Sequence, residues 1–114
     1  MTDEHKVCVI LHSALMTAQI GGMSLQRAEL IEAAIIQHFG NLEPGAATVL
    51  LEELLEHKDD IRMVWIVLMT PAEVGGMATE RSEAVLVDVL RCDQNLTDSN
   101  RQTLAKIIEQ TAKN

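Results

Sequence analysis

Apolar residues recur along this chain at the three- and four-residue intervals that are typical of amphipathic helices. In the first segment they are Val7, Ile10, Leu11, Ala14, Leu15 and Ala18. This spacing predicts a helix that ends at Gly21 and Gly22, because glycine readily adopts the left-handed conformation that closes a helix. Two short runs, Val7–Leu11 and Val85–Val89, have strand-like content. The longer helical pattern around each run favours a helix there as well.

Two more helices are predicted before residue 58. Ser24 can cap a second helix that extends to about Phe39 and stops at Gly40. Pro44 suits the first turn of a third helix. The apolar stripe of that helix consists of Ala47, Leu50, Leu51, Leu54 and Leu55, and its outer face holds Glu52, Glu53 and Glu56.

The second half of the chain follows the same plan. The segment Ile61–Met69 is apolar on nearly every side apart from Arg62, so we expect it at the centre of the core. Pro71 should end or kink this helix. A fifth helix is predicted from the stripe formed by Ala78, Ser82, Val85, Leu86, Val89 and Leu90. Thr97 or Asp98 should cap a last helix whose inner face is Leu104, Ile108 and Ala112.

Short sequence matches recur in the same order in the two halves. They pair Leu15-Met16-Thr17 with Leu68-Met69-Thr70, Gly21-Gly22-Met23 with Gly75-Gly76-Met77, Arg27-x-Glu29 with Arg81-x-Glu83, and Asn41-Leu42 with Asn95-Leu96. The first pair is offset by 53 residues and the others by 54, so the second copy carries one extra residue near Pro71. Such matches predict an internal repeat. We therefore expect one all-α domain, residues 1–114, folded as a compact bundle of about six helices in two pseudo-symmetric three-helix halves, about 4–57 and 58–112.

Composition and charge argue against several classes of function. The chain is 47% hydrophobic and carries a formal net charge of −8, which disfavours nucleic acids and anionic membranes as partners because both attract cationic proteins. The first 57 residues hold only Lys6 and Arg27 against eight carboxylates, so a basic partner would meet this half. The acidic N-terminus is unlike a signal peptide, and the longest apolar run, Met63–Met69, is too short to cross a bilayer. We therefore expect a cytoplasmic protein.

The order helix, glycine turn, helix, Phe39-Gly40-Asn41-Leu42 and helix, followed by the same plan again, resembles the TerB-like (tellurite-resistance B) family. The resemblance covers nearly the whole chain and implies a metal-responsive or stress-associated role. The family's turn usually reads Asp-Gly-x-Ile-Ser-x-x-Glu, with its acids near one another in the fold. Here Ile20 and Val74 replace the Asp, and Arg27 and Arg81 replace the Glu.

The loss of these acids leads us to expect neither calcium nor zinc at the glycine turns, because calcium needs about six to eight oxygen ligands. Glu29 and Glu83 remain near enough for a displaced, weak site. A second candidate pair for a metal is Glu53 and His57, one helical turn apart. The neighbouring cations, Lys58 and Arg62, favour a solvated helix end instead. We therefore assign no metal and no cofactor.

Catalytic chemistry and phosphate binding find little support in the sequence. The Gly-Gly-Met turns lack the preceding strand and the lysine of a phosphate-binding loop, so a close helix–helix turn is favoured.

Cys8 and Cys92 form no Cys-x-x-Cys pair, and their apolar neighbours suggest buried thiols in a reducing compartment. His12 lies one turn from Cys8, but no orienting group or oxyanion site is recognisable, so a partly buried histidine is expected. No catalytic residue is assigned.

Two recurring residue pairs are the candidate contact sites. Arg27 and Arg81 fall in the first turns of their helices, where a cation opposes the helix dipole. Pairing of Arg27 with Glu83, and of Arg81 with Glu29, would suit a two-fold arrangement; alternatively, both arginines extend into solvent. The matching methionines, Met16 with Met69 and Met23 with Met77, either fill the core or line a groove for an apolar ligand or a partner helix.

These observations favour a non-enzymatic helical protein-interaction module whose protein partner the sequence does not name. One alternative is the metal-responsive or stress-associated protein that the TerB-like resemblance implies. A second is a small apolar-ligand-binding protein or enzyme with a cavity between the halves. Wide apolar helix faces on a 12.6 kDa chain also predict self-association, and a symmetric homodimer is the commonest form.

Overall fold

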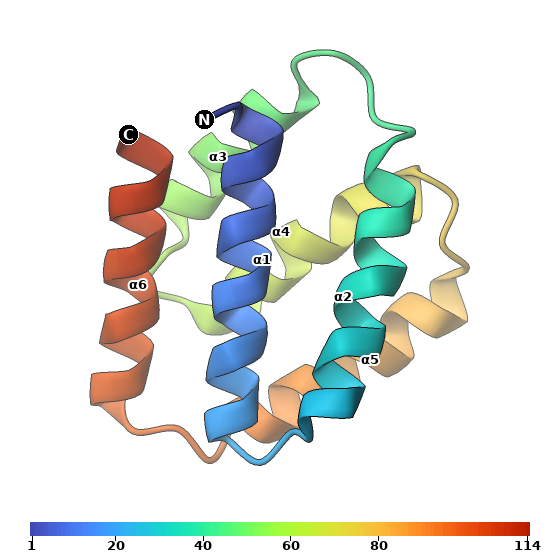
Figure 1. Ribbon diagram of the computed structural model, residues 1–114. Helices are drawn as coiled ribbons and strands as arrows, with labels where there is room; N and C mark the ends of the chain where they lie inside the picture. Colours follow the sequence, from blue (N-terminus) through green and yellow to red (C-terminus); the bar gives the residue numbers. More distant parts are fainter.

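The computed structural model describes all 114 residues and contains six helices and no strands (Figure 1). The helices are α1 (Asp3–Ile20), α2 (Leu25–Phe39), α3 (Ala46–Glu56), α4 (Ile61–Val74), α5 (Thr79–Asp93) and α6 (Asp98–Lys113). The predicted all-α architecture of about six helices is therefore confirmed, and both runs with strand-like content are helical.

The helices surround one apolar core. α1 lies between α2 and α6 in Figure 1 and also packs against α3 and α5, while α4 packs against α2, α3 and α5. The largest fully buried side chains come from α1, α2, α3, α4 and α6, and Trp65 on α4 is the bulkiest of them. The segment expected at the centre of the core is mostly there, although Ile66 is 37% exposed.

Side-chain caps and glycines set the helix boundaries. Ser24 caps α2 by accepting a hydrogen bond from the backbone N–H of Arg27, and Thr97 forms a capping box with Asn100 on α6, as their residue types predict. Two boundaries differ from the expectation. Pro44 precedes α3, which begins after Gly45, and Pro71 lies inside α4, which continues to Val74. A proline so close to the end of a helix removes one backbone hydrogen bond without stopping it.

The two Gly-Gly turns have the same backbone conformation. Gly22 has φ 114° and Gly76 has φ 113°, in the left-handed region that glycine adopts freely. In each turn the N–H of the following methionine donates to a carbonyl five residues back: Met23 to Ala18 at 3.1 Å and Met77 to Ala72 at 2.9 Å. Each turn ends one long helix and starts the next.

The same turns also hold helix ends together. The Asn41 Nδ2 donates to the Gly75 carbonyl and the Asn95 Nδ2 donates to the Gly21 carbonyl, both at 2.8 Å. A Cβ at Gly21 would lie 2.0 Å from the Cys92 carbonyl oxygen, so only glycine fits there. The expectation that the glycines allow close backbone approach is confirmed. The contacts join the end of α5 to the end of α1 and the end of α2 to the end of α4.

The third helix of each half packs differently. α6 has 16 residues and packs against α1 and α3, whereas α3 has only 11 residues and contacts α1, α4 and α6. A hollow of about 290 Å³ remains between α3 and α4, beside Leu42, Val49 and Val74. The third helices of the two proposed halves, α3 and α6, therefore have different packing partners.

Candidate functional site

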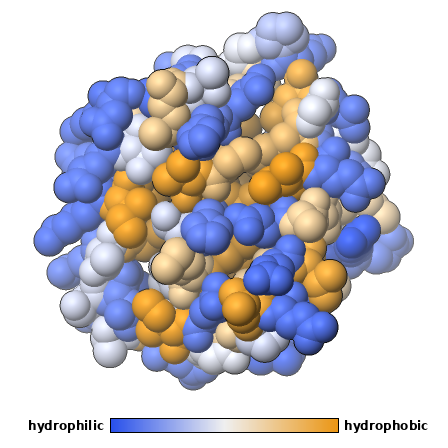
Figure 2. All heavy atoms as spheres, viewed as in Figure 1, coloured by the Kyte–Doolittle hydropathy of each residue, from blue (hydrophilic) through white to orange (hydrophobic).

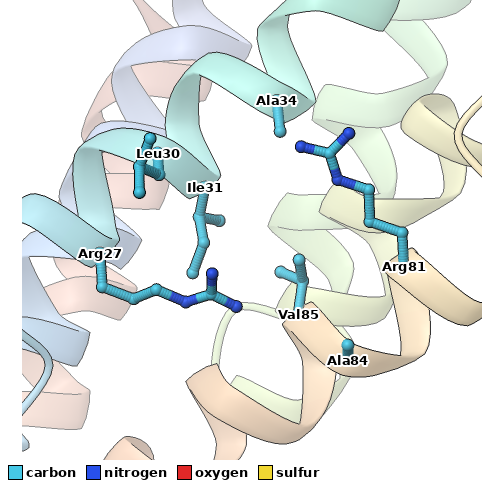
Figure 3. A pocket seen from close by; sticks show the side chains of 7 residues that line it. All are labelled: Arg27, Leu30, Ile31, Ala34, Arg81, Ala84 and Val85. Carbon is cyan, nitrogen blue, oxygen red and sulfur yellow. The ribbon is translucent and has the colours of Figure 1, made fainter.

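A hollow of about 200 Å³ lies between α2 and α5. We call it the α2–α5 groove, and it is lined by Arg27, Leu30, Ile31, Ala34, Arg81, Ala84 and Val85 (Figure 3). Ile31 and Val85 are buried, while Leu30 is 60% exposed. The groove thus combines an apolar lining with two guanidinium groups.

Helical spacing explains why these residues meet. Residues three, four and seven positions apart share one face of a helix. Arg27 shares its face of α2 with Leu30, Ile31 and Ala34. Arg81 shares its face of α5 with Ala84, Val85 and Asp88. The two faces are turned toward each other, so that Arg27 reaches toward α5 and Arg81 reaches toward Ala34 of α2 (Figure 3).

The two arginines have different electrostatic surroundings. The Nε of Arg27 donates to Asp88 Oδ2 at 3.1 Å, and its Nη2 makes a second, shorter hydrogen bond to the same oxygen. This ion pair joins α2 to α5. Arg81 makes no ion pair, because the residue of α2 that its guanidinium approaches is Ala34. One end of the groove is therefore neutralised and the other carries an unpaired cation.

The predicted pairing of the arginines with Glu83 and Glu29 is wrong. Glu29 and Glu83 are exposed and form no ion pair. Each lies two residues beyond its arginine, and so points away from the facing helix. The sequence reasoning missed Asp88, although its position seven residues after Arg81 places it on the face of α5 that meets α2.

The recurring methionines do not line a common groove. Met23 and Met77 are only 8% and 5% exposed, and Met69 is buried as well. Met16 is the exposed member of the set. Of the two interpretations left open by the sequence, the structure supports core filling for Met23, Met69 and Met77.

The neighbourhood of Cys8 differs from the expectation in three ways. His12 is exposed, and Glu32 of α2 supplies an orienting carboxylate, with 2.9 Å between His12 Nδ1 and Glu32 Oε2. The Cys8 thiol is only half-buried, as is that of Cys92. Burial, Glu32 and Glu4 all raise the pKa of the Cys8 thiol, so the reactive thiolate is disfavoured.

The most unusual titratable group is Asp93 at the end of α5. It is 2% exposed, and Trp65 Nε1 donates to its Oδ2 at 2.8 Å. Its Oδ1 is buried without a hydrogen-bond partner. Burial raises the pKa of Asp93 to about 6, while the Trp65 hydrogen bond and Arg101 act in the opposite direction. Nothing in the sequence pattern marks this contact, because its partners are 28 residues apart.

The structure brings no group of three or more His, Cys, Asp and Glu side chains together in a way that could hold a metal ion. Ile20 and Val74, at the positions where TerB-like proteins place acids, are 65% and 75% exposed. No helix is both long and apolar enough to span a membrane.

Comparison of the chain with protein-family models, with curated proteins and with solved structures gave no match.

Proposed function

We propose that this chain is a non-enzymatic protein-interaction module and that its partner docks in the α2–α5 groove. The observation that carries the proposal is one groove that has an exposed apolar residue, Leu30, on its rim and the unpaired guanidinium of Arg81 in its lining. Arginine and large apolar residues are the types that contribute most at protein interfaces. The protein is expected to act in the cytoplasm, where its two free thiols would stay reduced.

The size of the groove favours a protein partner over a small molecule. Small-molecule sites usually enclose roughly 300–1,000 Å³, whereas this groove offers about 200 Å³ and is open to solvent. A hollow of this size suits one or two side chains of a docked protein. The acidic remainder of the chain, with a net charge of −8, disfavours nucleic acid as the partner.

We further propose that the chain is an internal repeat, about 4–57 and 58–112, with an approximate two-fold axis through the groove. Arg27 and Arg81, Leu30 and Ala84, and Ile31 and Val85 are each 54 residues apart and line the same hollow. Asn41 bonds to Gly75 and Asn95 bonds to Gly21, so the two donors, and likewise the two acceptors, are also 54 residues apart. Both observations support the repeat that the sequence matches suggest.

The test compares two apolar-to-acidic variants at similarly exposed positions. Leu30→Glu lies on the rim of the groove, and Val49→Glu lies beside the separate hollow between α3 and α4; the two side chains are 60% and 54% exposed. Tagged wild type and both variants are captured from the native cells, and bound proteins are quantified by mass spectrometry. The proposal expects a protein that is retained by wild type and Val49→Glu and lost with Leu30→Glu. Equal retention by both variants would contradict it.

A further inference from the structure

We propose that the partner presents a helix on which an aliphatic side chain and an Asp or Glu lie one turn apart, with the carboxylate bound by Arg81. This inference rests on the proposed docking function and adds the chemistry of the docked segment. The aliphatic side chain would fill the hollow above Ile31 and Val85. The carboxylate would meet the guanidinium that the fold leaves without a partner.

The charges in the groove are unequal because one position differs between its two sides. Asp88 neutralises Arg27 from α5. The residue 54 positions earlier, on the facing side of α2, is Ala34, which offers Arg81 no acceptor. Two arginines in equivalent places would accept a docked helix in either direction. With Arg27 already paired, only the Arg81 end attracts a carboxylate, so the acidic residue of the partner helix lies at that end of the groove.

The geometry also sets the spacing on the partner. Arg81 borders the same hollow as Leu30 and Ala84, so an anchor in that hollow lies next to the guanidinium. Side chains three or four residues apart on a helix are about 5–6 Å apart, which matches neighbouring positions in one small hollow. An acidic residue at this spacing from an aliphatic anchor is the simplest pattern that fills the hollow and also pairs with the Arg81 guanidinium.

Paired substitutions at Ala34 separate charge from shape. Ala34→Asp would give Arg81 the same kind of partner that Asp88 gives Arg27, whereas Ala34→Asn places a side chain of nearly equal size there without the charge. Arg81→Gln removes the cation at an exposed position and leaves the apolar lining residues of the groove unchanged. Circular dichroism and thermal melting would establish that each variant is folded.

The probe is a displayed library of 16-residue helical peptides with randomised positions on one face, selected separately against wild type and each variant. Wild type and Ala34→Asn should select Asp or Glu one turn from an aliphatic residue, and Ala34→Asp and Arg81→Gln should lose this preference. Individual peptides from the wild-type selection should bind Ala34→Asp roughly two- to fivefold more weakly than Ala34→Asn, as expected for an exposed ion pair.

Four outcomes would overturn the inference: no acidic preference with wild type, the same preference with Ala34→Asp, no enriched peptide, or a homodimer that Ala34→Asp dissociates. The last would show that a second copy of the chain occupies the groove. If capture of a partner depends on Leu30 while selected peptides show no acidic preference, the docking function stands and only its chemistry is wrong.

Discussion

Gly21 illustrates how far a single residue controls the fold. A Cβ at this position would lie 2.0 Å from the Cys92 carbonyl oxygen, so α1 and α5 would have to separate. We predict that Gly21→Ala lowers the free energy of unfolding by about 3 kcal/mol, as overpacking against backbone does. Gly22→Ala should cost only about 1 kcal/mol, because a side chain there has open space but requires φ +114°.

The control for both is Gly40→Ala. Gly40 already has α-helical dihedral angles, and a Cβ would meet nothing within 4 Å. This variant should be unchanged or more stable by up to about 1 kcal/mol. Urea denaturation measures all three variants, and similar losses for Gly21→Ala and Gly40→Ala would show that the close approach is not present.

Asp93 should make stability depend on pH. Its folded-state pKa of about 6 lies above the ordinary value of 3.8, so the folded protein binds the proton more tightly than the unfolded chain. The resulting stabilisation is present below the unfolded-state pKa and is lost as the pH rises through about 6. Between pH 4.5 and 7.5, wild type should lose about 2 kcal/mol more stability than Asp93→Asn, which cannot ionise. Chemical denaturation at the two pH values, followed by the fluorescence of Trp65, measures this difference. Parallel pH profiles for the two proteins would contradict the prediction.

At the scale of helices, the sequence predicted most of what was found. The stripe that begins at Val7 indicated α1, and the residue types of Ser24 and Thr97 indicated the starts of α2 and α6. These features depend on neighbours within one or two turns, which sequence patterns record. The expectation that Pro71 ends its helix is wrong, because only three helical residues follow it and a proline so near the end does not stop a helix. The alternative expectation, a kink at Pro71, stays a prediction.

Asn41 and Asn95 should contribute comparably to the packing of helix ends. Each donates one side-chain hydrogen bond of 2.8 Å to the carbonyl of a glycine in the opposite half. We predict that Asn41→Ala and Asn95→Ala each lower the free energy of unfolding by about 1 kcal/mol, with Asn95, the more enclosed bond, at the higher end. Gln37→Ala, at an exposed position on α2, is the control and should be nearly neutral. Thermal unfolding of the three variants tests this, and an effect of Gln37→Ala equal to the others would count against it.

At the scale of the whole molecule, the candidate site could be predicted only in part. The recurrence of Arg27 and Arg81 marked both arginines as unusual, but the partner of Arg27 depends on how α2 and α5 face each other. That arrangement is set by the core, which includes Ile31 and Val85 of the groove, and by the glycine turns, which lie outside it. The unpaired state of Arg81 follows from Ala34, a residue that none of the sequence matches between the two halves includes.

Self-association remains a prediction for the whole molecule. Several large apolar side chains are exposed; Val49 and Val74 lie beside the hollow between α3 and α4, and Met16 and Val87 lie on other helices. Figure 2 shows apolar atoms in several places among hydrophilic ones on one face. We expect a homodimer because burial of such surfaces is favourable. Light scattering at tens of micromolar protein measures it, and the mass of a single chain would contradict the expectation.

The central claim, that a protein partner occupies the α2–α5 groove, is tested most directly by photo-crosslinking inside native cells. A leucine-sized diazirine amino acid is placed at Leu30 in one protein and at Val49 in another, two positions of similar exposure. Both proteins are irradiated under the same conditions, and adducts are identified by mass. The proposed function predicts one partner adduct from position 30 and none from position 49. Adducts of equal yield from both positions, or none from position 30, would contradict it.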